Sequence, residues 1–242
     1  MLKIFDVVGD RDSCVLAQKV DAALRAAIAK CDLNPDDGIY GIDGMSGKKY
    51  RYFINTLIAS LGDARYLEIG SWMGSTLCSA IHGNKVRAVA IDNWSEFGGP
   101  KEQFMANLRK FITPDVHVTF AESDFRKVDY SKLPGPFNVY LFDGPHDAID
   151  QYQGLKLPMP CLDEKFVFIV DDWNWERVRE GTFAAMARCG VVALYAASIR
   201  STDDGLSPQH LTPLIDFRRA RDFDWHNGYF IAVLAKPSAQ GL

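Results

Sequence analysis

The sequence lacks an excess of charge of either sign, a long apolar run and any closely paired cysteines. Its 242 residues carry 27 Lys and Arg against 31 Asp and Glu, so there is no positive excess to neutralise a nucleic-acid backbone. No window approaches the roughly 20 apolar residues of a membrane span. Asp6 and Asp10 interrupt the first residues before an apolar run long enough for a signal peptide. We therefore expect no nucleic-acid partner, no membrane segment and no secretion.

The cysteines are five in number, widely scattered and never in a Cys-x-x-Cys pair, which argues against a disulfide framework and a thiolate zinc site. They are Cys14, Cys31, Cys78, Cys161 and Cys189. We expect buried thiols in a reducing compartment, and hence a cytoplasmic protein.

What the sequence does have is ample apolar material, at 48% of residues, for one large α/β domain. Residues 1–62 are expected to form a helical appendage packed on the core. Apolar spacing predicts one helix over 14–31, with Ser13 as its N-cap, and a second over 48–61. Residues 63–242 are expected to form the main domain.

In this main domain, short and nearly continuous apolar runs alternate with helical patterns, which is typical of a parallel sheet covered on both faces. We expect helices at about 74–82, 101–112, 147–155 and 175–189. The last two apolar runs have no strong helix between them, which indicates an antiparallel pair. We therefore predict an α/β, doubly wound, mostly parallel seven-stranded sheet with an antiparallel terminal pair. The seven predicted strands are 66–69, 86–91, 116–120, 137–142, 166–170, 191–199 and 228–236.

The residues that follow the first three strands point to a nucleoside ligand, because ligands of open α/β sheets bind at the carboxyl ends of the strands. The first junction, YLEIGSWMGST, ends its strand with Glu68 and offers Gly70 for a tight turn and Gly74 for close helix packing. It lacks the G-x-G-x-x-G of a dinucleotide site, and its acid suits an amino group better than a pyrophosphate. Asp92 follows 24 residues later, where an acid binds ribose hydroxyls, and Ser123 and Asp124 can accept from an adenine amino group.

The E-x-G-x-x-x-G junction with these acids resembles the class I S-adenosylmethionine-dependent methyltransferases, much as it occurs in the catechol O-methyltransferase branch. The resemblance covers about residues 50–235. It implies S-adenosylmethionine as cofactor, with Asp92 on the ribose and Asp143 also beside the cofactor. It further implies Glu68, Gly70, Trp72, Gly74 and Thr76 around the methionine portion and Asn93, Ser123 and Asp124 near the adenine.

Three more acids, Asp143, Asp171 and Asp172, follow the fourth and fifth strands, which should be neighbours. Converging carboxylates repel one another unless a cation lies between them, and oxygen ligands favour Mg²⁺ or a similar divalent ion. His146 follows Asp143 by three residues and can face the same pocket. These residues could also have purely structural roles. One of Asp171 and Asp172 could be a helix N-cap, and His146 could be a surface residue in the first turn of a helix.

In the metal-dependent O-methyltransferases a base stands three residues beyond the first metal ligand. The resemblance therefore implies that Asp143, Asp171 and Asp172 are metal ligands and that His146 is the general base. The catechol enzymes carry Asp-Asn and a lysine at the corresponding positions. The D-x-x-H turn and the Asp-Asp pair are more similar to the macrocin and mycinamicin sugar O-methyltransferases.

These patterns favour a metal-assisted O-methyltransferase acting on a hydroxyl of a small molecule, such as a sugar or glycosylated metabolite. The rival is a non-catalytic nucleoside-binding regulatory or scaffold protein, and a nicotinamide oxidoreductase is disfavoured by the missing glycine motif. The sequence leaves open the acceptor, the metal requirement and the existence of a homo-oligomer. Candidate acceptor contacts, which could equally be lid or surface residues, are Trp173, Trp175, Arg218, Arg219, Trp225 and His226.

Overall fold

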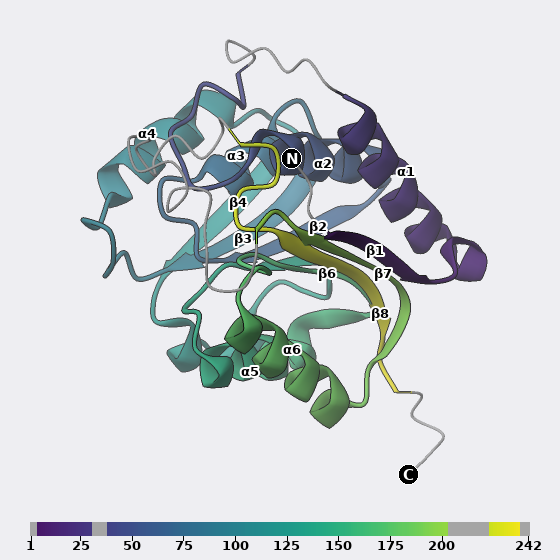
Figure 1. Ribbon diagram of the computed structural model, residues 1–242. Coiled ribbons are helices and arrows are strands. Elements are labelled where there is room, and N and C mark those ends of the chain that lie inside the picture. The colour runs from purple at the N-terminus through teal and green to yellow at the C-terminus, as the bar shows by residue number, and fades with distance from the viewer. Residues whose placement is uncertain (1–3, 31–37, 203–222, 238–242) are drawn as a thin grey trace.

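The computed structural model describes residues 4–30, 38–202 and 223–237 and shows one mixed sheet with helices on both faces (Figure 1). Its strands are β1 (Ile4–Gly9), β2 (Ala64–Ile69), β3 (Val86–Asp92), β4 (Val116–Glu122), β5 (Phe137–Phe142), β6 (Leu162–Val170), β7 (Val192–Arg200) and β8 (Tyr229–Ala235). Its α-helices are α1 (Val15–Ala29), α2 (Lys48–Ser60), α3 (Ser75–Ile81), α4 (Lys101–Phe111), α5 (Ala148–Lys156) and α6 (Glu176–Cys189). Each lies within two residues of a helix expected from apolar spacing.

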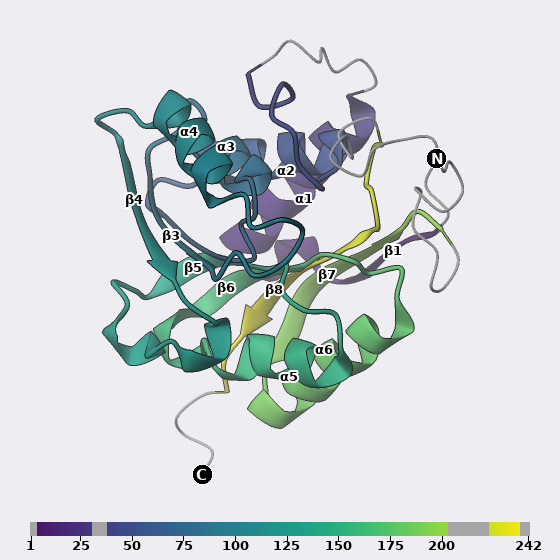
Figure 2. The same ribbon diagram turned by 90° about the vertical axis from the view of Figure 1, so that its left-hand side faces the viewer.

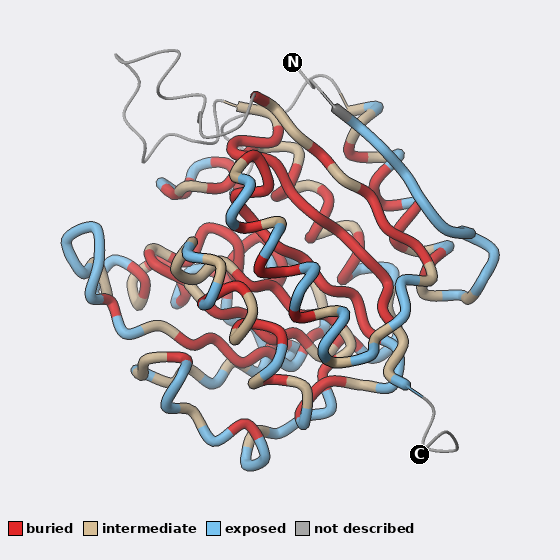
Figure 3. Tube along the Cα trace, turned by 60° about the horizontal axis from the view of Figure 1, so that its bottom comes forward, coloured by how far each residue is buried: buried red, intermediate tan, exposed pale blue. Residues whose placement is uncertain are grey.

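The strand order is β1-β7-β8-β6-β5-β2-β3-β4, and the five strands from β6 to β4 are parallel to one another. Strand β8 runs antiparallel to both β6 and β7, which confirms the antiparallel terminal pair and the fold class. The sheet has eight strands, one more than predicted, because β1 pairs antiparallel with β7 at the outer edge. Residues 5–9 of β1 are exposed, as Figure 3 shows, so no buried apolar run marked this segment as a strand.

Helices cover both faces of the sheet (Figure 2), and one hydrophobic cluster lies on each face. Helices α1 to α4 bury their apolar sides against one face, with Leu24, Phe53 and Leu77 among the buried residues. Helices α5 and α6 cover the opposite face, where Leu155 and Val178 pack against the strands. This arrangement largely buries the central strands on both sides and leaves the carboxyl ends of the parallel strands open for a ligand.

Some local predictions need correction. Helix α1 is capped by Cys14 without a side-chain hydrogen bond, because Ser13 lies in a preceding 3-10 turn. Cys78 and Cys161 are buried thiols as expected, but Cys14 and Cys189 are only partly buried. Cys31 lies outside the described residues. In the part of the chain that the structure describes, no helix is both long and apolar enough to cross a membrane.

Candidate active site

A cavity of about 730 Å³ lies beyond the carboxyl ends of β2, β3, β5 and β6, in the volume range of small-molecule sites. The chain runs outward from β2 to β3 and β4 on one side and to β5 and β6 on the other, so this edge is where the strand order reverses. Ten predicted site residues line it: Gly70, Trp72, Asp92, Asn93, Ser123, Asp124, Asp143, His146, Asp171 and Asp172.

The strand ends are tied together at Gly70. The Gly70 N–H donates to the carbonyl of Ile91 and the Asp143 N–H donates to the carbonyl of Ile69, each at 2.9 Å. Gly70 has φ +88°, and a Cβ there would lie 1.7 Å from the Asp143 carbonyl oxygen. Only glycine therefore allows the β2 turn to pass this close to the end of β5.

Asp92, the predicted ribose ligand, also organises the loops around it. Its Oδ2 accepts the backbone N–H of Trp72 at 2.7 Å and its Oδ1 accepts that of Trp94 at 2.6 Å. The Trp94 indole in turn donates to the Trp72 carbonyl at 2.9 Å. Trp72 and Trp94 have positive φ angles, 44° and 47°, which residues other than glycine rarely adopt. The Asp92 carboxylate therefore holds two turns in an uncommon backbone conformation. Trp72 thus contributes to the wall through its backbone as well as its ring.

Three residues predicted around the methionine portion lie behind the cavity wall. Glu68 is fully buried and accepts the Tyr66 hydroxyl at 2.6 Å. Burial raises the pKa of Glu68 to about 7, although the hydroxyls of Tyr66, Ser71 and Thr76 favour its charged form. Gly74, with φ +82°, precedes α3 and packs against Phe104. Thr76 is buried in the first turn of that helix.

At the far end of the cavity, the predicted adenine contacts are joined by an arginine that the sequence analysis missed. The Ser123 N–H donates to the Asp92 carbonyl at 3.0 Å. Arg126 donates to Asp124 Oδ1 through its backbone N–H at 3.0 Å and through its Nη1 at 3.1 Å. Its guanidinium also pairs with Asp150. The carboxylate of Asp124 is thus already engaged, while the Asn93 side chain accepts from Ser95.

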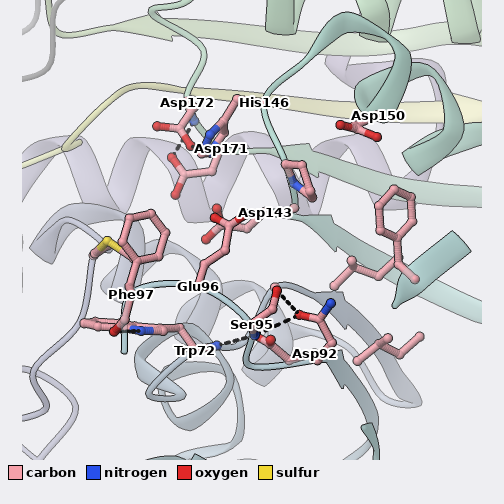
Figure 4. A pocket seen from close by; sticks show the side chains of 18 of the residues that line it. Trp72, Asp92, Ser95, Glu96, Phe97, Asp143, His146, Asp150, Asp171 and Asp172 are labelled. Carbon is pink, nitrogen blue, oxygen red and sulfur yellow. Dashed lines mark hydrogen bonds and ion pairs between the residues drawn. The ribbon is translucent and has the colours of Figure 1, made fainter. Parts of the chain in front are cut away.

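The other end of the cavity gathers the predicted metal and base residues, as Figure 4 shows. One ligand atom each from Asp143, His146 and Asp172 lies within 4.8 Å of the other two. His146 Nε2 is 2.6 Å from Asp172 Oδ2, and the ring stands edge-on to Trp175 at 4.7 Å between centroids. These contacts hold the imidazole of His146 beside the carboxylates of Asp143 and Asp172.

The charges at this end perturb one another. Enclosure by the protein and the neighbouring Asp172 raise the pKa of Asp143 well above its usual value. Burial alone would raise the pKa of Asp172, but His146 outweighs it and the pKa is lowered. Burial alone would lower the pKa of His146, but the charge and hydrogen bond of Asp172 raise it to about 9. The imidazolium therefore balances a carboxylate in this structure.

Asp171 takes a different position from its neighbour. Its Oδ1 accepts the backbone N–H of Asp172 at 2.7 Å, and burial raises its pKa well above the usual range. It is not part of the three-residue group whose ligand atoms converge. Neither acid caps α6, whose N-cap is Trp175 and has no side-chain cap hydrogen bond, so the capping alternative is wrong.

The candidate acceptor contacts divide into two groups. Trp175 and His226 line the cavity beside the carboxylates, whereas Trp173 and Trp225 are buried and do not. Arg218 and Arg219 lie outside the described residues. Burial lowers the pKa of His226 to about 4, which makes its ring a neutral part of the wall.

Asn227 is the second residue that the sequence analysis missed. Its Nδ2 donates to Asp172 Oδ1 at 2.5 Å, and the residue lines the cavity. It lies in a short turn before β8, so no local pattern pairs it with an acid 55 residues earlier.

Comparisons with known proteins bear on the type of domain and on the fold. Residues 67–173, which include the ends of β2, β3, β5 and β6, match the sequence profile of a family described as "Methyltransferase domain". No match to the sequence was found among curated proteins.

Solved structures share the fold over most of the chain. The SAH-bound methyltransferase PaMTH1 of Podospora anserina is 11% identical over 91% of this chain and 88% of its own, with a TM-score of 0.53. The O-methyltransferase TomG of Streptomyces achromogenes, involved in tomaymycin synthesis and solved with SAM, is 13% identical over 94% and 92%, with a TM-score of 0.51. The O-methyltransferase of Bacillus cereus in complex with SAH is 13% identical over 94% and 92%, with a TM-score of 0.50. The fold and the domain match together confirm the resemblance to the S-adenosylmethionine-dependent methyltransferases.

Proposed function

We propose that this protein is an S-adenosylmethionine-dependent O-methyltransferase that uses a divalent cation to bind a hydroxylated small molecule. The observation that carries the proposal is the convergence of Asp143, His146 and Asp172 at one end of a cavity that Asp92 and the Gly70 turn also line. A pure nucleoside binder would have no use for two converging acids and a histidine. The non-catalytic alternative gains no support from these residues.

The electrostatics of the cavity suit a positively charged methyl donor. Its lining includes the acids Asp92, Glu96, Asp124, Asp143, Asp147, Asp150, Asp171 and Asp172, against one arginine. Such a wall attracts the sulfonium and ammonium groups of S-adenosylmethionine and repels anions. We place its ribose at Asp92, its adenine between Ser123 and Asp124, and its methionine portion at the Gly70 turn.

The donor atoms at the acidic end fit a divalent cation. Asp143 and Asp172 offer carboxylate oxygens, which are the hard ligands that Mg²⁺ prefers. Asp171 is the third candidate ligand, although its Oδ1 already accepts a backbone hydrogen bond. When bound, such an ion lowers the pKa of a coordinated hydroxyl and thus eases its deprotonation.

His146 is the proposed general base. Its Nε2 now faces Asp172, whose negative charge it balances. With Asp172 held as a metal ligand, the imidazole would no longer have this task, and Nε2 would be available to accept the proton of the acceptor hydroxyl. The edge contact with Trp175 keeps the ring in place for this transfer.

For the acceptor we propose a neutral, hydroxylated molecule such as a sugar or a glycosylated metabolite. The acidic lining disfavours carboxylated or phosphorylated acceptors. Trp175 and His226 provide an aromatic wall beside the carboxylates. We also propose a reducing, cytoplasmic setting, which the free thiols of the four described cysteines support.

Calorimetry and a methyl-transfer assay test the proposal. We expect the purified protein to bind S-adenosylhomocysteine with or without Mg²⁺. We expect it to transfer the methyl group of S-adenosylmethionine to a hydroxylated acceptor only when Mg²⁺ is present. EDTA should abolish transfer while leaving S-adenosylhomocysteine binding largely intact. Absence of S-adenosylhomocysteine binding would overturn the methyltransferase assignment, and full transfer in EDTA would overturn the role of the metal.

A further inference from the structure

We propose that Asn227 supplies its side-chain amide oxygen as a ligand to the divalent cation, beside Asp143 and Asp172. The proposal rests on the metal site of the proposed function and adds a residue that lies outside the strand-end junctions. It gives the turn before β8 a role in binding the ion.

The turn that carries Asn227 is firmly held against the acidic end of the cavity. The Asn174 N–H donates to the Asn227 carbonyl at 2.9 Å, and the Gly228 N–H donates to the Trp225 carbonyl at 2.7 Å. Gly228 has φ +84°, and a Cβ on it would lie 2.4 Å from the Ile199 carbonyl oxygen. The turn is therefore packed closely against the end of β7 and is hydrogen-bonded to Asn174, two residues beyond Asp172.

The side chain of Asn227 has one polar atom satisfied and one unsatisfied. The residue is 7% exposed, and its Nδ2 donates to Asp172 Oδ1. Its Oδ1 is buried and has no hydrogen-bond partner in the described part of the chain. A buried carbonyl-type oxygen needs a donor or a cation, and the carboxylate that Asn227 contacts, Asp172, keeps a lowered pKa and is therefore an acceptor only.

A cation at this position meets that need and balances the charge. Amide oxygens are ordinary ligands of hard divalent ions. Asp143 and Asp172 bring two negative charges, which a divalent ion neutralises, and the amide adds a third oxygen without adding charge. The hydrogen bond from Nδ2 also keeps Asp172 next to Asn227, so both side chains can face one ion.

The test is a Mn²⁺ titration followed by electron paramagnetic resonance of the free ion, with S-adenosylhomocysteine at saturation and no acceptor. We expect Asn227→Leu to weaken Mn²⁺ affinity at least tenfold relative to wild type, and Asn227→Asp, which keeps an oxygen at the site, to bind Mn²⁺ at least tenfold more tightly than Asn227→Leu. If the leucine variant does not fold, Asn227→Ala, which adds no bulk, replaces it in the titration. The matched control is Asn138→Ala, whose side chain is hydrogen-bonded to Arg65 and Asp63 elsewhere in the fold. It should leave Mn²⁺ affinity unchanged.

The outcomes separate this inference from the proposed function. S-adenosylhomocysteine affinity, measured on the same samples, reports whether each variant is folded. Wild-type Mn²⁺ affinity in a folded Asn227→Leu or Asn227→Ala variant would overturn the inference alone, and would assign the buried oxygen to the acceptor instead. No Mn²⁺ binding by the wild-type protein would overturn the metal site itself, while S-adenosylhomocysteine binding would still support a methyltransferase.

Discussion

The carbonyl oxygen of Asp143 lies where a side chain on Gly70 would have to stand, 1.7 Å from an added Cβ. The contact joins the end of β2 to the end of β5, the two strands between which the order of the sheet reverses. Gly70 and the first proposed metal ligand therefore lie in one close backbone contact between neighbouring parallel strands. A change at Gly70 should consequently also disturb the position of Asp143.

Gly70→Ala is expected to destabilise the protein by about 2–5 kcal/mol, because it adds both an overlap with backbone and a strained positive φ. Urea unfolding measures the loss. Gly62→Ala is the matched control, since an added Cβ at Gly62 meets nothing within 4 Å. Equal stability of the two variants would mean that the strands do not cross as closely as described.

Asp92→Ala is expected to weaken S-adenosylhomocysteine binding more than Asp92→Asn does. Alanine removes the acceptor for the ribose and also the acceptor for the N–H groups of Trp72 and Trp94. Hydrogen bonds to a charged group contribute about 1.5–3 kcal/mol each, so the loss should reach tenfold to a hundredfold or more. Calorimetry of folded protein gives the answer, and unchanged affinity of Asp92→Ala would refute the placement of the nucleoside.

His146→Ala is expected to lower kcat by about 10²–10⁴, the usual contribution of a positioned general base. S-adenosylhomocysteine affinity should stay close to wild type, because the imidazole contacts Asp172 and Trp175 at the acceptor end. Single-turnover rates with a true acceptor separate chemistry from product release. A variant with wild-type rates would show that His146 is not the base; a helix-start role is wrong, because α5 begins at Ala148 with Asp147 as its N-cap.

Asp172→Asn and Asp171→Asn are expected to differ in metal affinity. Asp172 belongs to the converging group, whereas Asp171 already accepts the N–H of its neighbour. We expect the larger loss of Mn²⁺ affinity, at least tenfold, in Asp172→Asn. A greater loss in Asp171→Asn would show that the buried acid is the better ligand and that its backbone hydrogen bond breaks when the ion binds.

Glu68→Gln is expected to stabilise the cofactor-free protein at neutral and alkaline pH. Burial raises the pKa of Glu68 from 4.5 in the unfolded chain to about 7, so the folded wild type binds the extra proton and loses stability as pH rises between these values. The advantage of glutamine should be absent near pH 4 and approach about 3 kcal/mol above pH 7. Denaturation curves across this range measure it, with exposed Glu164→Gln as the control. A constant difference at all pH values would contradict the raised pKa.

Much of the fold followed from residue patterns because the relevant signals are local. Buried apolar runs marked the strands from β2 to β8, and apolar spacing marked the helices. Ligands of open α/β sheets bind at the carboxyl ends of the strands. This rule predicted that Asp92, Asp143, His146 and Asp172 lie around one cavity, and they do.

The features that sequence reasoning missed depend on contacts between distant segments. The hydrogen bonds that occupy Asp92 come from backbone N–H groups, which residue types do not reveal. Asn227 meets Asp172 only because the pairing of β6 with β8 places their adjoining turns together. Arg126 follows Asp124 closely, but its second partner, Asp150, lies on another element.

The edge strand β1 pairs with a strand that is synthesised much later. Its residues pair with β7, from Gly9 opposite Tyr195 to Ile4 opposite Arg200, so most of the chain separates the two partners. During synthesis, β1 has no partner strand until residue 200 has left the ribosome, and closing so long a loop is slow because its entropy is lost before the contacts form. Strand β7 in turn joins the rest of the sheet through β8, which is synthesised later still. Protection of the β1 amides from hydrogen exchange would therefore report when this edge of the sheet has formed.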